Sequence, residues 1–175
     1  MRVKRPRPIV VRRAPGRPQQ ARVQLAHGGC RAAIGRSGLR ALKREGDGGT
    51  PLGRFAVRLV LYRADRVGRP RTALHARAIR AYDGWCEDPT DRNYNRLVRH
   101  SLDGDRLMRE DHLYDLVLVL GYNDRPRVRG KGSAIFVHLA RLDYLPTAGC
   151  IALNRRDLLA LIAQLRPRTS ILVTR

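Results

Sequence analysis

Apolar runs, separated by short polar stretches that contain glycine or proline, dominate the pattern of this chain. The two strongest runs are 55–62 (FAVRLVLY) and 116–122 (LVLVLGY), and both have the length of a strand. The second run is apolar throughout, which indicates a strand buried on both faces. Shorter apolar or alternating runs predict further strands at 22–26, 30–34, 73–80, 134–137, 151–153 and 170–174.

Turn and capping residues divide these runs into elements. His27-Gly28-Gly29 separates two of the short runs and predicts a β-hairpin. Near the C-terminus, Asn154 suits a helix N-cap, and an apolar face follows as far as Leu165, before Pro167 ends the helix. A helical turn is also expected at 40–45. The chain is therefore predicted to be a mainly β domain with a few short helices.

Composition changes this picture at the N-terminus. Residues 1–20 are basic and proline-rich and have no long apolar segment, so we expect a flexible tail that pairs at most one short strand. A single domain is then expected at 21–175, a length that suits one core. The apolar stretch of the tail is too short for a secretory signal peptide, and no segment reaches membrane-spanning length.

The charge of the chain is extreme, with a formal net charge of +21 that comes almost entirely from arginine. Such a charge favours polyanionic partners. Nucleic acid and the carboxylate-rich stem peptides of peptidoglycan both fit, and a genome rich in G and C would also give arginine for lysine. The basic residues are spread along the chain without a zinc-finger spacing or an aromatic RNA-binding signature. A basic nucleic-acid-binding module without catalysis is kept as the alternative class.

Three cysteines, Cys30, Cys86 and Cys150, leave at least one thiol unpaired within the chain. A Cys30–Cys86 disulfide would need an oxidising compartment, and two reduced core thiols are the alternative. The chain contains no Cys-x-x-Cys or His-x-x-x-His pair, so the sequence gives little support for a metal site.

The stretch 133–154 carries the candidate chemistry. An apolar run ends on His138, a polar loop follows, and Cys150 comes directly before the next apolar run. An imidazole can take the proton of a nearby thiol, and the bare backbone at Gly149 can turn N–H groups towards an oxyanion. An inert buried thiol is the alternative, because free cysteine is often buried.

Two blocks of the chain resemble the signature of the L,D-transpeptidase catalytic-domain family. His138 matches the first histidine of the family, and Thr147, Gly149 and Cys150 match its Ser/Thr-His-Gly-Cys sequence. The block 43–55 (KREGDGGTPLGRF) resembles the family's Gly-Asp-Gly-x-Thr-Pro element. The chain departs from the family pattern in three ways: Ala148 replaces the second histidine, Ala152 replaces a frequent arginine, and the spacer from His138 to Cys150 is shorter than usual.

The resemblance implies a twisted β-sandwich and a cysteine acyltransferase that acts on the stem peptides of peptidoglycan. It also implies that the reaction needs no metal ion and no organic cofactor. Cys150 would be the nucleophile, His138 the base and later the acid, and the N–H groups of Gly149 and Cys150 the oxyanion donors. The amine of a second stem would then resolve the thioester as a 3–3 crosslink, after release of a terminal D-amino acid. Water in its place would make an L,D-carboxypeptidase, and a protein amine would attach that protein to the wall.

The resemblance also implies action in the cell envelope or periplasm, although no signal peptide is visible, and nucleic acid is then not an expected partner. Further substrate-binding residues are expected in the irregular stretch 82–112, which should border the cleft, and around the basic loop 127–132. His112 is the candidate that replaces the missing second histidine. The full set of candidates is Trp85, Asp111, His112, Tyr122, Asn123 and Arg129.

Overall fold

The computed structural model describes residues 6–99 and 104–175, and one large curled sheet forms its centre. The strands of this sheet follow the order β11-β12-β13-β3-β2-β1-β14-β6-β7, and β11 also pairs with β6. All of these strands except β7 therefore form a closed ring. Their bounds are β1 (Ile9–Ala14), β2 (Arg17–Leu25), β3 (Gly28–Ala33), β6 (Gly53–Tyr62), β7 (Ala76–Ala78), β11 (Leu116–Leu120), β12 (Phe136–Leu139), β13 (Ile151–Leu153) and β14 (Ser170–Thr174).

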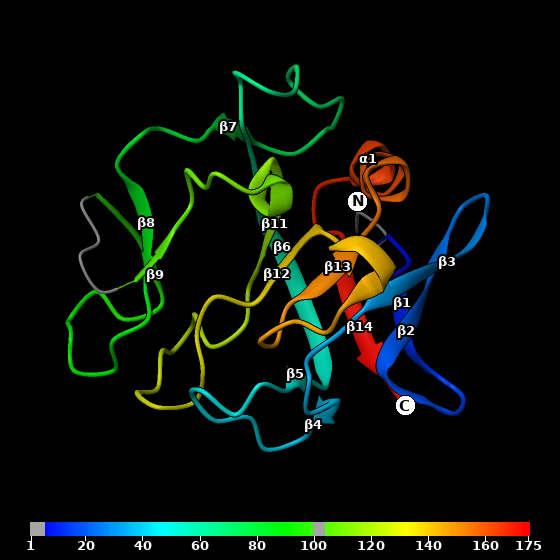
Figure 1. Cartoon of the computed structure of the whole chain (residues 1–175), viewed down its shortest axis with the longest axis horizontal. Helices are drawn as coiled ribbons and strands as arrows, with labels where there is room; N and C mark the ends of the chain where they lie inside the picture. Colours follow the sequence, from blue (N-terminus) through cyan, green and yellow to red (C-terminus); the bar gives the residue numbers. More distant parts are fainter. Residues whose placement is uncertain (1–5, 100–103) are drawn as a thin grey trace, which may run out of the picture.

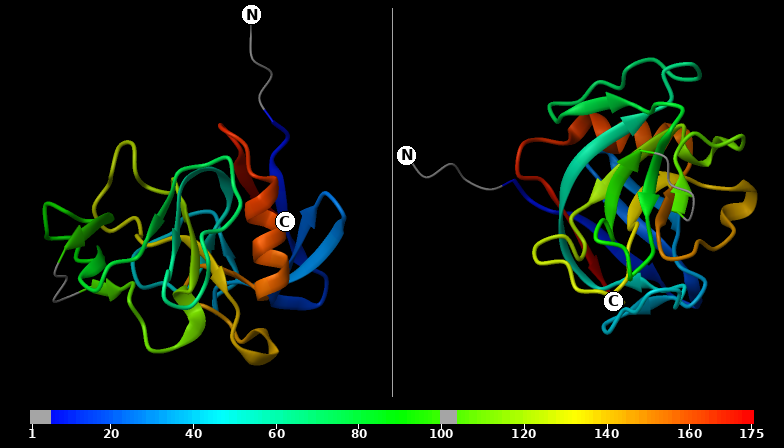
Figure 2. Two further views of the ribbon diagram at one scale, coloured as in Figure 1. Left: turned by 90° about the horizontal axis from the view of Figure 1, so that it is seen from above. Right: turned by 90° about the vertical axis from the view of Figure 1, so that its left-hand side faces the viewer.

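Smaller elements flank this sheet. The small three-stranded sheet lies on one side of the molecule, and the helix α1 lies on the other side, together with the strands β1–β3 of the main sheet (Figures 1 and 2). The small sheet consists of β8 (Asp83–Cys86), β9 (Arg96–Arg99) and β10 (Gly104–Arg106). The remaining elements are the short pair β4 (Leu39–Arg40) and β5 (Thr50–Pro51), the 3-10 helices η1 (His112–Tyr114) and η2 (Leu142–Tyr144), and α1 (Arg155–Gln164).

Two hydrophobic cores meet at β11. Leu116, Leu118 and Leu120 face the first core, which also holds the apolar face of α1. Val117 and Val119 point to the opposite face and join Trp85, Phe136 and Cys150 in the second core. Because successive side chains of a strand alternate between faces, the all-apolar run becomes a strand buried on both sides, as the sequence predicted. The second core is the one that contains the candidate nucleophile.

The disorder expected for the N-terminal tail is wrong from Ile9 onwards, where the alternative, a short paired strand, is found. β1 lies between β14 and β2, parallel to β14 with Ile9 opposite Ile171, and antiparallel to β2. Ile9 and Val11 are buried, whereas Arg12 and Arg13 are exposed. The expected boundary at residue 21 therefore falls inside β2. The helical turn expected at 40–45 is also wrong, because β4 there pairs with β5.

The mainly β class is confirmed, as are the strands at 55–62 and 170–174 and the hairpin formed by β2 and β3. The helix begins after Asn154, whose Oδ1 accepts from the Asp157 N–H at 2.9 Å. The run 73–80 forms a strand only at 76–78. The stretch 82–112 carries the small sheet and not an irregular loop, and its residues 100–103 lie outside those described.

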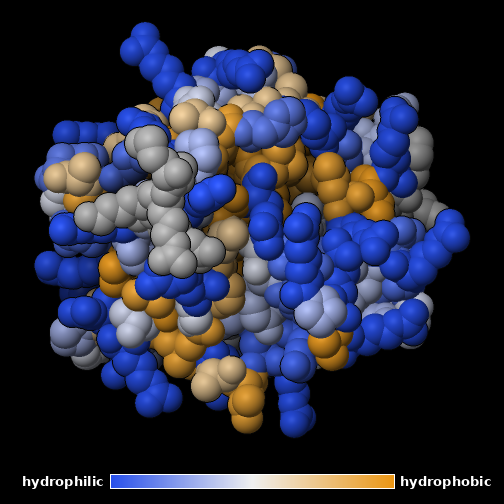
Figure 3. Space-filling model, turned by 180° about the vertical axis from the view of Figure 1, so that it is seen from behind, coloured by the Kyte–Doolittle hydropathy of each residue, from blue (hydrophilic) through white to orange (hydrophobic). Residues whose placement is uncertain are grey.

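Hydrophilic side chains cover much of the surface. The view from behind shows them spread between apolar patches and not gathered in one stripe (Figure 3), as expected for arginines distributed along the chain. Within the described part of the chain, no helix combines the length and apolar character needed to cross a membrane.

Candidate active site

The pairing of β12 with β13 brings His138 and Cys150 to one face of the main sheet. The two strands are parallel, with His138 opposite Ala152. Successive side chains of a strand alternate between faces, and Cys150 precedes Ala152 by two residues. The side chain of Cys150 therefore lies on the same face as those of Ala152 and His138. His138 and Cys150 consequently line one pocket of about 510 Å³. The small side chain of Ala152 leaves room between them.

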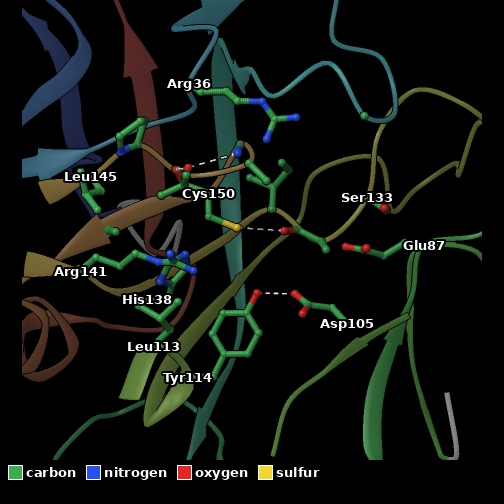
Figure 4. A pocket seen from close by; sticks show the side chains of 18 of the residues that line it. Arg36, Glu87, Asp105, Leu113, Tyr114, Ser133, His138, Arg141, Leu145 and Cys150 are labelled. Carbon is green, nitrogen blue, oxygen red and sulfur yellow. Dashed lines mark hydrogen bonds between the residues drawn. The ribbon is translucent and has the colours of Figure 1, made fainter. Parts of the chain in front are cut away.

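Cys150 is held as a buried thiol. Its Sγ donates to the carbonyl of Ala134 at 3.1 Å and accepts from the Phe136 N–H at 3.4 Å (Figure 4). Burial raises the pKa of this thiol to about 12, and the carboxylates of Asp105 and Glu87 act in the same direction. The thiol of Cys150 is therefore un-ionised at neutral pH in the ligand-free protein.

The tautomer of His138 follows from its backbone contact. Nδ1 lies 2.8 Å from the carbonyl oxygen of Leu139, and a carbonyl can only accept, so Nδ1 carries the proton and Nε2 keeps its lone pair. Burial lowers the pKa of the imidazole to about 4. The ring of Tyr114 packs edge-on against it, with 5.3 Å between centroids. Within the described residues, His138 and Cys150 share no hydrogen bond, and the resting pair is a neutral imidazole beside a neutral thiol.

These two protonation states predict the pH dependence of thiol alkylation. The rate at which iodoacetamide alkylates Cys150 in the ligand-free protein should rise about tenfold per pH unit from pH 7 to 10, because the thiolate fraction rises by that factor below the pKa. Peptide mass mapping separates Cys150 from Cys30 and Cys86, and the Cys150→Ser variant gives the background. A plateau in the rate below pH 8 would show a preformed ion pair and contradict this.

Gly149 lies where the two sequence blocks meet. Its φ of +144° favours glycine, and a Cβ at this position would lie 2.9 Å from the carbonyl oxygen of Gly49. Thr50 closes the contact: its Oγ1 donates to the Gly149 carbonyl at 2.8 Å and accepts from the Gly35 N–H at 2.8 Å. The block 43–55 therefore supports the turn that presents Cys150.

The hydroxyl of Thr147 forms hydrogen bonds within the same turn. Its Oγ1 accepts from the Gly149 N–H at 3.1 Å and donates to the Cys150 carbonyl at 2.6 Å. The Gly149 N–H, which the sequence suggested as an oxyanion donor, is therefore already engaged by Thr147. This leaves the N–H of Cys150 as the candidate donor beside the sulfur.

Removal of the Thr50 hydroxyl tests this support. Thr50→Val should lower the free energy of unfolding by about 2–4 kcal/mol, because it leaves the buried Gly35 N–H and Gly149 carbonyl without a partner. Turnover should fall as well, since the Cys150 turn loses its tie to block 43–55. Urea unfolding measures the loss in stability. Thr50→Ser keeps the hydroxyl and should retain most of both properties; an equal loss in the serine variant would contradict the hydrogen-bond explanation.

Three of the predicted substrate-binding residues form hydrogen bonds that stabilise neighbouring segments of the protein. Trp85 donates from Nε1 to Asn95 at 2.9 Å and packs edge-on against Phe136 in the second core. The hydroxyl of Tyr122 donates to the carbonyl of Lys131. The amide of Asn123 donates to the carbonyls of Val128 and Gly132, both at 2.9 Å, and so fixes the basic loop 127–132.

The other three lie on the surface. Asp111 caps η1 and pairs with Arg109 at 2.7 Å. The side chain of His112 is 80% exposed and contacts Asp115 at 2.9 Å. Arg129 is exposed in its loop. The described lining of the Cys150 pocket includes none of the six candidates.

Sequence reasoning missed most of the charged residues that surround Cys150. η1 turns His112 outwards and places Tyr114 in the pocket, where its hydroxyl donates to Asp105. Tyr114 is aromatic and follows the polar His112 by two positions in the sequence. This difference was the signal that could have identified Tyr114 as the residue of η1 that faces the pocket. The charged side chains that line the pocket are Arg36, Lys43, Glu45, Glu87, Asp105, Arg109 and Arg141.

The three cysteines are all free thiols, with Cys30 half-buried and Cys86 buried. The described residues include no group of three or more His, Cys, Asp or Glu side chains that could hold a metal ion.

A comparison with protein families identifies the family of the chain. The family model of the L,D-transpeptidase catalytic domain (YkuD) matches residues 16–173. The chain belongs to the L,D-transpeptidase catalytic-domain family. No curated protein matches the chain significantly. Membership supports an enzyme of the L,D-transpeptidase type that acts on peptidoglycan, and the family suggests action at the cell wall.

Proposed function

We propose that the chain is a cysteine peptidyltransferase that forms a thioester between Cys150 and a peptidoglycan stem peptide and releases the terminal D-amino acid. The observation that carries this proposal is the common face of His138 and Cys150 in one pocket, with Nε2 of the imidazole unprotonated. We expect this reaction in the cell envelope or periplasm.

The acylation step needs only residues of this site. As Sγ of Cys150 attacks the amide carbonyl of the substrate, its proton passes to Nε2 of His138. The negative oxygen of the tetrahedral intermediate is stabilised by the Cys150 N–H. His138 then gives the proton to the nitrogen of the leaving D-amino acid, and the carbon–nitrogen bond breaks. The imidazole ends neutral, and the thioester stays on Cys150.

Two arginines suit the carboxylate of the leaving D-amino acid. Arg36 and Arg141 line the pocket, and their guanidinium groups have no hydrogen bond or ion pair within the described part of the chain. Guanidinium groups bind carboxylates with two parallel hydrogen bonds. These side chains would replace the arginine that the family often has at the position of Ala152.

The thioester is resolved by the acceptor. With the side-chain amine of a second stem, the product is a 3–3 crosslink. With water it is a tripeptide, and the enzyme acts as an L,D-carboxypeptidase. With a protein amine, that protein becomes attached to the wall.

Incubation with a disaccharide-tetrapeptide, followed by mass spectrometry of enzyme and products, tests this function. We expect a thioester on Cys150, free D-amino acid, and either crosslinked dimer or tripeptide, which together identify the acceptor. A folded protein that forms no thioester and releases no D-amino acid would overturn the proposed function.

A β-lactam should trap the same thiol. The strained amide of a carbapenem is open to the attack that forms the thioester, so intact-protein mass spectrometry should show one adduct per chain. Peptide mapping should place it on Cys150, because the described lining of the pocket that contains His138 includes neither Cys30 nor Cys86. An adduct on Cys30 or Cys86, with Cys150 unmodified, would refute the assignment of the nucleophile.

A further inference from the structure

Most charged side chains in the Cys150 pocket already have a partner. Lys43 pairs with Asp47 at 2.7 Å. The carboxylate of Glu45 accepts from the hydroxyls of Tyr94 and Ser133, the latter at 2.8 Å. These contacts hold both side chains in the scaffold around the pocket.

The same applies to the charged residues beside Tyr114. Asp105 accepts from the Tyr114 hydroxyl and lies 3.4 Å from Arg109. Arg109 in turn pairs with Asp111 at 2.7 Å. Neither charge is free to take a substrate group without giving up these contacts.

Glu87 differs from these acidic residues. It follows directly after β8, is half-buried, and lines the pocket. Within the described residues, no hydrogen bond or ion pair engages its carboxylate. Its side chain points towards Cys150, and in this view the sulfur lies between Glu87 and His138 (Figure 4).

The surroundings of Glu87 favour its protonated form. Burial raises the pKa of this carboxyl to about 7, the neighbouring Asp105 and Glu45 add to the effect, and Lys43 opposes it. A cation placed against Glu87 would relieve the repulsion among these carboxylates. A carboxylate with a pKa close to neutral is also a far better proton acceptor than an ordinary one.

We propose that Glu87 receives the ammonium group of the acyl acceptor and takes one of its protons, and so directs the thioester to an amine in preference to water. This inference rests on the proposed function of Cys150. It assigns to this chain a residue that discriminates between transfer and hydrolysis.

In this aminolysis step, each of the three protons of the ammonium group has a defined destination. The ammonium group gives one proton to the Glu87 carboxylate and becomes a neutral amine. The amine attacks the thioester carbonyl and passes a second proton to Nε2 of His138 as the carbon–nitrogen bond forms. His138 gives that proton to Sγ of Cys150 as the carbon–sulfur bond breaks. The third proton stays on the new amide nitrogen.

The charge of the acceptor provides the selectivity. An ammonium group gains a salt bridge in a half-buried site, where Coulomb attraction exceeds that in bulk water. Water gains no comparable interaction. The unpaired arginines Arg36 and Arg141 of the same pocket would instead attract the carboxylates of the donor.

The Glu87→Gln variant tests this proposal through the fate of one acyl-enzyme. Wild-type and variant enzymes are acylated with disaccharide-tetrapeptide and offered either a stem tripeptide with a free primary amine or hydroxylamine, which is uncharged at neutral pH. The ratio of aminolysis to hydrolysis is measured by mass spectrometry. With the primary amine, this ratio should fall at least about tenfold in the variant. With hydroxylamine, it should change less than about twofold.

Glu110→Gln is the matched control, because it removes a carboxylate that is exposed and outside the described lining of the pocket; its ratio should equal that of the wild type. An unchanged ratio with the primary amine in Glu87→Gln, or equal losses with both acceptors, would overturn the role of Glu87. Absence of any thioester in the wild-type enzyme would instead overturn the proposed function.

If Glu87→Gln does not fold, the wild-type enzyme still tests the electrostatic capture. Raising the ionic strength screens the attraction between an ammonium group and a carboxylate. The aminolysis ratio of the primary amine should then fall with added salt, while that of hydroxylamine stays constant. A ratio that is insensitive to salt for both acceptors would overturn the inference.

Discussion

Cys150→Ser is expected to lower release of the D-amino acid from a disaccharide-tetrapeptide by on the order of 10⁴-fold, the scale of loss seen when the nucleophile of an acyl-transfer enzyme is removed. A hydroxyl in this buried place is much harder to ionise than a thiol, and the neutral imidazole of His138 is a weak base for it. Serine can still donate to the carbonyl of Ala134, so the fold should persist. A coupled assay for the D-amino acid measures the loss.

Cys30→Ser is the matched control for this variant. Cys30 is a free thiol in β3, half-buried and outside the described lining of the Cys150 pocket. We expect its turnover to remain within about threefold of the wild type, as for an independent site. Full activity in Cys150→Ser, or a comparable loss in Cys30→Ser with the fold intact, would contradict the role of Cys150.

Hydrophobic pattern predicted the parts of the fold that local sequence determines. The all-apolar run of β11 becomes a strand between two cores, because its leucines and valines alternate between faces. Asn154 begins α1 at the expected residue, since its side chain satisfies the Asp157 N–H. In both cases the decisive contacts lie within a few residues or follow from a simple period.

Pattern failed at the N-terminus, because the contacts that order it come from the other end of the chain. Ile9 and Val11 become core residues only when β14 pairs with β1. Without that partner, two apolar side chains among exposed arginines resemble a disordered tail. The register between β1 and β14 joins Ile9 to Ile171, at opposite ends of the sequence, which periodicity cannot show.

The sequence predicted that Cys150 and His138 lie in one site, but it did not predict the charged residues around them. Cys150 and His138 lie in one stretch joined by a loop, so their spacing alone indicated that they belong together. The surrounding charges come from separate segments: Arg36 follows β3, Glu87 follows β8, and Asp105 belongs to β10. The closure of the main sheet and the docking of the small sheet bring them together, and neither event has a local signature.

Gly149→Ala is expected to be the most damaging substitution of a residue that takes no part in proton transfer. Alanine at a φ of +144° is strained by about 1–3 kcal/mol, and its Cβ would lie 2.9 Å from the carbonyl oxygen of Gly49. The backbone of one sequence block must then move away from the other, which adds about 1–3 kcal/mol. We expect a melting temperature lower by roughly 10 °C and turnover reduced at least about 100-fold.

Gly28→Ala separates the two causes of this loss. Gly28 has a similar φ of +132°, but no atom lies within 4 Å of the place that a Cβ would take there. This variant should therefore show the cost of backbone strain alone, with a smaller fall in melting temperature and normal turnover, because the β2–β3 turn is outside the described lining of the pocket. If Gly149→Ala and Gly28→Ala lose the same stability and both keep their turnover, the contact between Gly49 and Gly149 does not position Cys150. A loss of turnover confined to Gly149→Ala would show that this contact sets the position of the nucleophile.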